Sequence, residues 1–309
     1  MADDILIHLG LPKTGTTAIQ RTLHAGSEQL AAAGFYYPPP LSDADPKHQS
    51  LVTGLMSNDH GFLKAALFSA PRHCKLIFSA EGLTNHLYDF PKTSLAQFRQ
   101  CLSGWRTRGI LVHRPWEDWV KSYFKQCIVN PPNRQFGHYG FFGTLDEFRC
   151  NERVRCYARL NNLLVDIGDR LGVERITVLD YSPAIRDEFL AYLGLEPGRL
   201  PRVAAANDSL SDVAAETIRQ LNAWLRQGPE RRLWLAEIAA QDGSNNAVAN
   251  TVKAGDLAVR DRLDPALIRR LKWTAASGLA VSREDFDAFR KGLTARLACR
   301  STLKPTREA

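Results

Sequence analysis

The sequence lacks any apolar run as long as a membrane-spanning helix, which takes roughly 20 residues. It also lacks the paired C-x-x-C spacing of a zinc site, internal repeats and any recognised DNA- or RNA-binding module. These absences argue against a helical membrane protein, a zinc domain and a repeat scaffold. We therefore expect no membrane span and no nucleic-acid partner.

The six cysteines are scattered, and we expect free, mostly buried thiols in a reducing compartment. The N-terminus, Met-Ala-Asp-Asp, is acidic and leads into an apolar run without the pattern of a signal peptide. The sequence therefore predicts a cytoplasmic protein. The formal net charge of +7 suits an anionic ligand, although it would equally suit nucleic acid or a membrane surface.

Apolar runs alternate with helical patterns in the first two thirds of the chain. We predict strands at residues 5–9, 74–79, 109–113 and 175–179. This alternation is typical of an α/β protein with a parallel sheet, whose ligands bind at the carboxyl ends of the strands. The expected helices cover residues 17–33, 48–56, 61–69, 94–105, 115–129, 145–171, 212–226, 230–240, 265–275 and 283–297.

The C-terminal third is helical in pattern, with a mobile or lid-like connection expected at residues 241–262. We predict a single domain over residues 1–309. Its α/β nucleotide-binding core would cover residues 1–205, and a helical extension over residues 206–309 would pack on that core.

Residues 10–17, Gly-Leu-Pro-Lys-Thr-Gly-Thr-Thr, stand between the first strand and the first helix. Backbone N–H groups and the positive helix end converge in such a turn, which suits an anion. The spacing is that of the P-loop G-x-x-x-x-G-K-[ST], but Thr16 occupies the place of the lysine, and the loop's lysine is Lys13. That displacement predicts an anionic ligand shorter than a triphosphate.

Residues 12–17 resemble the 5′-phosphosulfate loop of sulfotransferases, which use 3′-phosphoadenosine-5′-phosphosulfate (PAPS) as sulfuryl donor. Residues 8–20 are similar to bacterial members of that family. The resemblance implies a P-loop-like three-layer α/β/α fold with PAPS as co-substrate. The loop residues that would bind it are Pro12, Lys13, Thr14, Gly15, Thr16 and Thr17.

A second part of the resemblance lies at residues 110–123, where Arg114 ends a strand and Ser122 follows eight residues later. In the family an arginine and a serine at this spacing bind the 3′-phosphate of the donor. A helix that starts at Pro115 places Ser122 about two turns along. The alternative is an ordinary strand-to-helix turn with a surface salt bridge.

The leading candidate for the catalytic base is Glu81, which follows a strand in residues 78–83, the third part of the resemblance. Carbohydrate sulfotransferases resemble this segment, and there a glutamate takes the proton of the acceptor hydroxyl. The alternative for Glu81 is a helix-start carboxylate. His48 is the competing base, or else a capping group, whereas His8 lies inside a strand and fits a core histidine better.

Other residues have weaker signals. His86 and His138 could line the acceptor side, and the aromatic residues of 136–142 could stack on a sugar or pack their loop down. Tyr181 follows the fourth strand, where related enzymes have a tyrosine near the adenine, although core packing explains it as well. Residues 207–209 resemble a segment that closes over the nucleotide, or a plain helix cap.

The resemblance thus implies transfer of a sulfuryl group to an acceptor hydroxyl, activated by Glu81. Lys13 would stabilise the leaving phosphate, so no metal is expected. The acceptor would be a small molecule or a glycan, and a glycolipid acceptor would bring peripheral membrane contact. The sequence specifies neither the acceptor nor the oligomeric state. The alternatives are a nucleotide kinase or NTPase, with Mg²⁺ held by Thr16 or Thr17 and Glu81, and an inactive nucleotide-binding module.

Overall fold

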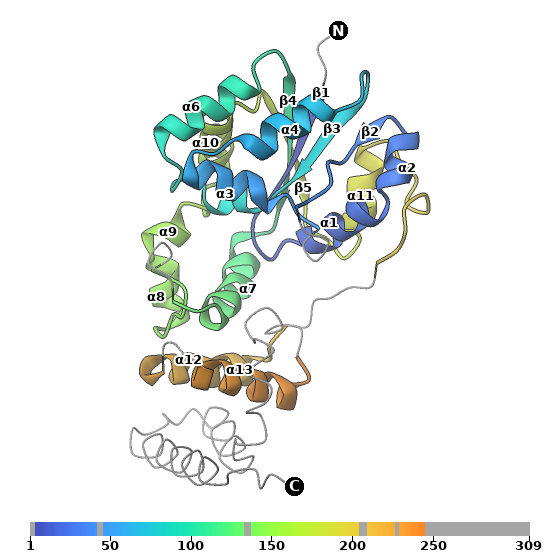
Figure 1. Cartoon of the computed structure of the whole chain (residues 1–309). Helices are drawn as coiled ribbons and strands as arrows, with labels where there is room; N and C mark the ends of the chain where they lie inside the picture. Colours follow the sequence, from blue (N-terminus) through green and yellow to red (C-terminus); the bar gives the residue numbers. More distant parts are fainter. Residues whose placement is uncertain (1–3, 42–45, 133–136, 204–208, 226–228, 245–309) are drawn as a thin grey trace, which may run out of the picture. The chain divides into compact units, whose positions relative to one another are not determined.

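A single sheet of five parallel strands forms the centre of the fold, in the order β2-β3-β1-β4-β5. The computed structural model describes residues 4–41, 46–132, 137–203, 209–225 and 229–244. Helices cover both faces of the sheet (Figure 1). This confirms the predicted P-loop-like three-layer α/β fold. The strands are β1 (Asp4–Gly10), β2 (Phe35–Tyr36), β3 (Lys75–Ser79), β4 (Arg106–His113) and β5 (Arg175–Asp180).

The central strand β1 is fully buried at Ile5, Ile7 and Leu9. Its neighbours are β3 on one side and β4 on the other, so strand order reverses at β1. Near-continuous apolar runs are typical of parallel strands covered on both faces, which is why the four predicted strands all occur. Ligands of open α/β sheets bind at such a reversal, beyond the carboxyl ends of the strands. The residues that follow β1, β3 and β4 meet there.

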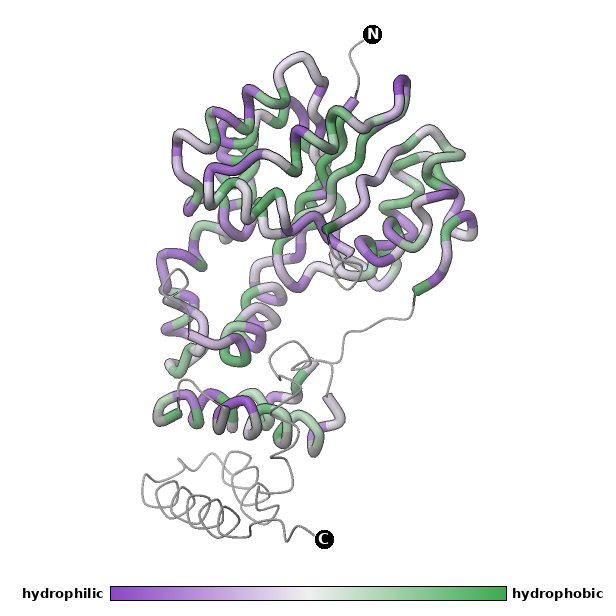
Figure 2. Tube along the Cα trace, in the orientation of Figure 1, coloured by the Kyte–Doolittle hydropathy of each residue, from purple (hydrophilic) through white to green (hydrophobic). Residues whose placement is uncertain are grey.

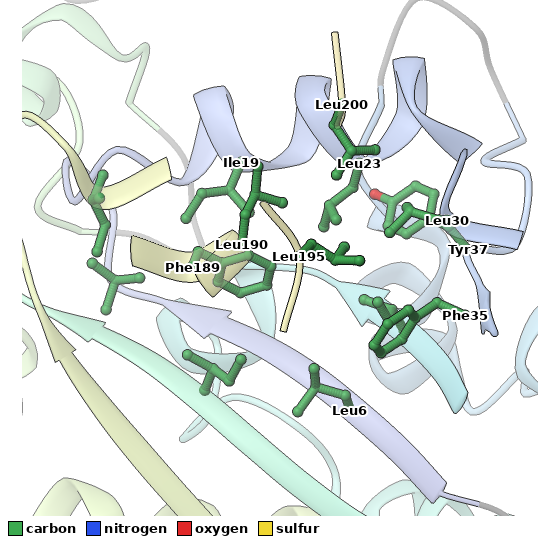
Figure 3. Close-up of a cluster of buried hydrophobic side chains, with 14 residues drawn as sticks. Leu6, Ile19, Leu23, Leu30, Phe35, Tyr37, Phe189, Leu190, Leu195 and Leu200 are labelled. Carbon is green, nitrogen blue, oxygen red and sulfur yellow. The ribbon is translucent and has the colours of Figure 1, made fainter. Parts of the chain in front are cut away.

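One face of the sheet is covered by α1 (Thr16–Ala25) and α11 (Ile185–Tyr192), as Figure 3 shows. Ile19 and Leu23 of α1 point from the helix toward the sheet, where they share a buried cluster with Leu6 and Phe189. Burying one such side chain contributes about 1.5–3 kcal/mol. The cluster therefore fixes α1, and with it the loop that precedes α1, against the strands.

The opposite face is covered by four further helices, which Figure 1 shows on the other side of the sheet. Figure 2 shows hydrophobic residues along the strands that these helices enclose. The predicted helix at residues 61–69 is confirmed with the same bounds, whereas the short α5 (Gly82–Asn85) and α11 were not predicted. The four helices are α3 (Gln49–Ser57), α4 (Gly61–Ser69), α6 (Lys92–Cys101) and α10 (Leu160–Leu171).

The single helix predicted at residues 17–33 is wrong, because Gly26 separates α1 from α2 (Ser27–Ala32). A Cβ atom at Gly26 would lie 1.9 Å from Leu200 Cδ2. The glycine therefore admits a leucine from far along the chain, and the helix pattern of α1 and α2 gives no sign of that contact.

The single helix predicted at residues 145–171 is also wrong. Asn151 has extended backbone (φ −63°, ψ 124°), and its side chain accepts a hydrogen bond from the N–H of Arg153 at 3.0 Å. A short polar side chain that binds its own backbone in this way competes with the helix. Three helices result: α8 (Leu145–Cys150), α9 (Glu152–Arg155) and α10.

The chain divides into two compact units, which are residues 1–119 with 155–206, and residues 120–154 with 207–309. The first unit contains the sheet. Helix α7 (Trp116–Val129) begins in the first unit and continues in the second. That the C-terminal extension packs on the nucleotide-binding core stays a prediction.

The second unit has its own core, in which α12 (Asp212–Trp224) and α13 (Pro229–Asp242) pack with the end of α7. Arg231 is 1% exposed, and its guanidinium donates to the carbonyl oxygens of Ile128 and Val129 and to Asn222 Oδ1. Burial lowers the pKa of Arg231 to about 10. The negative C-terminal end of α7 stabilises this buried cation.

Several predictions made for the whole chain reach beyond the described residues. The helices expected at residues 265–275 and 283–297 lie outside them. Residues 245–262 of the expected lid-like connection also lie outside them. Within the described ranges, the five cysteines are free thiols, as expected, but the prediction that most are buried is wrong, because only Cys127 is buried. No helix in those ranges is long and apolar enough to cross a membrane.

Candidate functional site

The loop between β1 and α1 has the backbone form of an anion-binding turn. Lys13 (φ 68°) and Gly15 (φ 78°) are both left-handed, and α1 begins at the next residue, Thr16. Alternating left- and right-handed residues turn successive N–H groups toward one point. The N–H groups of Thr16 and Thr17 belong to the first turn of α1, where helices leave such donors without an intrahelical partner.

The carbonyl groups of the loop are bound by donors of the protein itself. Thr14 Oγ1 donates to the carbonyl oxygen of Leu11 at 2.6 Å, and Trp119 Nε1 donates to that of Pro12 at 2.8 Å. The carbonyl oxygen of Lys13 accepts from Arg114 at 3.3 Å. With these three carbonyl oxygens engaged by the protein, the loop offers its N–H groups to an anion.

Trp119 is a site residue that sequence reasoning missed. It is 1% exposed on α7, and the sequence signal would have been the rule that a buried indole N–H needs an acceptor. That rule does not say which acceptor, because Pro12 lies 107 positions away.

Arg114 and Tyr181, predicted from different motifs, lie together beside the loop. The guanidinium carbon of Arg114 is 4.8 Å from the centre of the Tyr181 ring, a cation–π distance. A Cβ atom at Gly15 would lie 3.3 Å from Tyr181 Cε2 and 2.9 Å from Ile185 Cγ2. Gly15 therefore allows the ring to approach the loop closely, and a bulkier residue there would clash.

Glu81 also reaches this loop. It follows β3, stands at the N-cap of α5, and is partly exposed. Its Oε2 accepts a hydrogen bond of 2.5 Å from the hydroxyl of Thr16. The structure thus brings the predicted base against the first residue of α1, at the carboxyl end of the sheet.

His48 is placed differently. It is fully buried, its Nε2 lies 2.8 Å from the carbonyl oxygen of Pro38, and its Nδ1 accepts from the N–H of Ser79 at 2.9 Å. Burial lowers its pKa to about 4. With one ring nitrogen donating and the other accepting, His48 connects the segment after β2 to the end of β3. This geometry favours Glu81 over His48 as the base.

His8 is a core histidine, the interpretation that the sequence favoured. Its ring is fully buried, its Nδ1 lies 2.7 Å from Ser79 Oγ, and burial lowers its pKa to about 3. Ser79 is therefore bound by two buried histidines, two residues before Glu81. Sequence reasoning missed Ser79, because its role depends on the pairing of β1 with β3.

These buried histidines predict a loss of stability in mild acid. The pKa of His8 is about 3, and those of His48 and His138 are about 4, against 6.5 in an unfolded chain. Below pH 6.5 the unfolded chain binds protons that the folded protein does not bind until pH 3–4. The free energy of unfolding should therefore fall as the pH drops below 6.5, with a slope that approaches about 1.4 kcal/mol per histidine and pH unit near pH 5.

Urea unfolding between pH 7.5 and 5 measures this slope. Over this range His48→Asn should make the average slope shallower by about 0.8 kcal/mol per pH unit, because one buried imidazole is gone. His73→Asn, at an exposed turn, is the matched control and should leave the slope unchanged. An unchanged slope in His48→Asn would contradict the assignment of His48 as a buried neutral group.

The residues expected on the acceptor side lie mostly in the second unit. His138 is buried, with Nε2 2.9 Å from the hydroxyl of Tyr123, and Phe141 packs on Phe124 and Phe148. These contacts fit the alternative that the aromatic residues pack their loop down. Phe142 is 43% exposed.

Three other predicted features are not brought into the site by the described contacts. His86 lies 3.6 Å from Asp89 in an ion-pair geometry. Ser122 lies on α7 in the second unit, so its approach to Arg114 stays a prediction. Phe136 and residues 207–208 lie outside the described residues. In the described ranges, no group of three or more His, Cys, Asp or Glu side chains could hold a metal ion.

Comparison with known proteins gives little for this chain. No family model matches it, and no curated protein matches it. Among solved structures it is similar to mouse sulfotransferase SULT7A1 complexed with PAP, with 14% identity over 89% of each chain and a TM-score of 0.34. A likeness of this size has no weight for the function, which therefore depends on the chain's own residues.

Proposed function

We propose that this chain is a PAPS-dependent sulfotransferase that transfers a sulfuryl group to an acceptor hydroxyl. The observation that supports it best is the loop at residues 12–17, whose left-handed Lys13 and Gly15 turn N–H groups inward while Arg114 stands beside it. A carboxylate, Glu81, adjoins the same loop. An anion-binding turn next to a general base is what sulfuryl transfer needs.

The residues present fit the donor nucleotide. The N–H groups of Thr14 to Thr17 would hold the 5′-phosphosulfate, and Arg114 with Ser122 would hold the 3′-phosphate. A guanidinium suits a phosphate because it donates two parallel hydrogen bonds. Tyr181, which already lies against the loop and Arg114, would pack against the adenine.

When bound, the nucleotide supplies an electrophilic sulfur. A bond forms from the acceptor oxygen to that sulfur, and the bond from sulfur to the 5′-phosphate oxygen breaks. Glu81 takes the proton of the acceptor hydroxyl, and Lys13 stabilises the negative charge on the leaving phosphate oxygen. A preorganised donor of this kind is worth about 2.7–4 kcal/mol in the transition state. The charge of Lys13 makes a metal unnecessary in this proposal.

For the acceptor we propose a hydroxyl of a carbohydrate or glycolipid. This rests on the resemblance of residues 78–83 to carbohydrate sulfotransferases, in which a glutamate follows the strand. A screen of sugar, glycolipid and small alcohol acceptors with isotopically labelled donor tests it. Transfer to small alcohols alone would contradict a carbohydrate acceptor.

A nucleotide kinase or NTPase is the second candidate, because the contact between Thr16 and Glu81 resembles the hydroxyl and carboxylate that hold Mg²⁺ in such enzymes. The position of Thr16 argues against it. Thr16 occupies the place of the P-loop lysine, and the place of the metal-binding Ser or Thr is that of Thr17.

A thermal-shift comparison separates the two candidates. At about 100 times its dissociation constant, a ligand of the folded state adds about 2.7 kcal/mol, which raises the melting temperature by roughly 5 °C. We expect this rise with 3′,5′-diphosphoadenosine and not with ATP and Mg²⁺. The opposite result would overturn the proposed function.

Arg114→Ala should remove most of that rise, because the 3′-phosphate loses its guanidinium. Arg106→Ala, at the opposite end of β4, is the matched control and should keep the full rise. Binding without turnover on any acceptor would instead favour an inactive nucleotide-binding module.

A further inference from the structure

The hydroxyl of Thr16 is shared between two parts of the proposed reaction. It donates its hydrogen to Glu81 Oε2 at 2.5 Å, and it belongs to the loop that would hold the 5′ anion. A threonine hydroxyl has a single hydrogen to donate. The hydroxyl can therefore donate a hydrogen bond to Glu81 or to a bound anion, but not to both.

Packing fixes the side chain of Thr16 in this orientation. A Cβ atom at Gly10 would lie 2.1 Å from Thr16 Cγ2, so the methyl group of Thr16 occupies the space that Gly10 leaves. Thr16 is only 2% exposed. Because the methyl and the hydroxyl share one Cβ atom, the seated methyl keeps the hydroxyl oxygen beside Glu81, and only the O–H bond is able to turn.

The backbone of Glu81 is held equally firmly. Its carbonyl oxygen accepts hydrogen bonds from the N–H groups of Thr84 and Asn85, both at 3.1 Å. A Cβ atom at Gly82 would lie 2.7 Å from Val52 Cγ2, so the next residue is in tight contact with α3. If the Thr16 hydrogen turns away, its oxygen faces the carboxylate with lone pairs, and the Glu81 side chain, not its backbone, has to move.

We propose that Thr16 is a positioning residue that holds Glu81 against the loop until the 5′ anion of the donor takes its hydroxyl hydrogen. This rests on the proposed function. Binding of the donor would then release the carboxylate to meet the acceptor hydroxyl, so the base becomes available only when the sulfuryl group is in place. The consequence is an ordered reaction in which the donor binds first.

Nucleotide binding alone should reveal this exchange of partners. Binding must break the hydrogen bond from Thr16 to a charged acceptor, which is stronger than one to a neutral amide. Glu81→Gln should therefore tighten the binding of 3′,5′-diphosphoadenosine about 3- to 10-fold. Removing a negative charge near an anion would also tighten binding, but that effect does not depend on the Thr16 hydroxyl.

A double-mutant cycle separates these effects. The dissociation constant of 3′,5′-diphosphoadenosine is measured by calorimetry for wild type, Glu81→Gln, Thr16→Val and the double variant. We expect the tightening by Glu81→Gln to be at least threefold greater in the wild-type background than in the Thr16→Val background, where only the effect of the lost charge remains. Equal tightening in both backgrounds, or none in wild type, would overturn the proposal. Thr53→Val, an exposed threonine of α3, is the matched control and should bind as wild type does.

A second probe keeps the test decisive if Thr16→Val does not bind. Adenosine 3′-phosphate lacks the 5′ anion, so it leaves the hydrogen bond from Thr16 to Glu81 intact. Wild type and Glu81→Gln should bind it within twofold of each other. If Glu81→Gln tightened the binding of this probe as much as that of the diphosphate, the proposed change of hydrogen-bond acceptor from Glu81 to the 5′ anion would be refuted. If wild type binds neither nucleotide, the proposed function itself fails, and this inference fails with it.

Discussion

Glu81→Gln is expected to lower kcat by about 10²- to 10⁴-fold, which is the usual contribution of a general base. The amide has nearly the same shape, so the fold should remain intact. Nucleotide binding should persist, because the substitution removes a base without removing a donor to the anion. Transfer of labelled sulfate from saturating PAPS to an acceptor found in the screen measures the effect.

The control for this variant is Glu28→Gln, an exposed carboxylate in the first turn of α2, which should keep full activity. If Glu81→Gln kept more than a tenth of the wild-type kcat, the base would have to be sought elsewhere. Loss of activity in a folded His48→Asn protein would then point to His48, despite the two hydrogen bonds that occupy its ring.

The sequence predicted the strands and the loop well because their determinants are local. The strands β1, β3, β4 and β5 are apolar runs bounded by polar residues, and the loop has glycines at fixed spacing. The two-residue strand β2 was expected only as an extended segment, since its place at the sheet edge depends on pairing with β3.

What the sequence could not give were contacts between distant residues. Gly26, between α1 and α2, leaves room for Leu200, and the loop carbonyl of Pro12 is bound by Trp119. His48 was expected near a helix start and stands at the N-cap position of α3, although its side chain makes no capping hydrogen bond there. Whether it is a base or a structural group depends on Pro38 and Ser79, which meet it only in the folded chain.

Lys13→Gly is expected to lower kcat by about 10²- to 10³-fold without weakening the fold. The loss follows from removing the cation that would stabilise the leaving phosphate, worth about 2.7–4 kcal/mol. The fold should not suffer, because Lys13 has φ 68°, a left-handed conformation that glycine adopts freely. For a non-glycine residue this conformation costs about 1 kcal/mol. Sulfate transfer and urea unfolding, measured on one preparation, test both parts.

Two companion variants separate the charge of Lys13 from its backbone. Lys13→Ala should lose as much activity as Lys13→Gly. Only Lys13→Gly should raise the free energy of unfolding, because alanine keeps the cost of the left-handed conformation and glycine does not. Lys13→Arg keeps a positive charge and should retain more activity than either. If Lys13→Gly were as active as wild type, the cation would have no part in the reaction. If Lys13→Gly lost activity and became more stable, the left-handed conformation of Lys13 would have a functional reason. The positive charge needed for the reaction would then outweigh the cost of a non-glycine residue at this position.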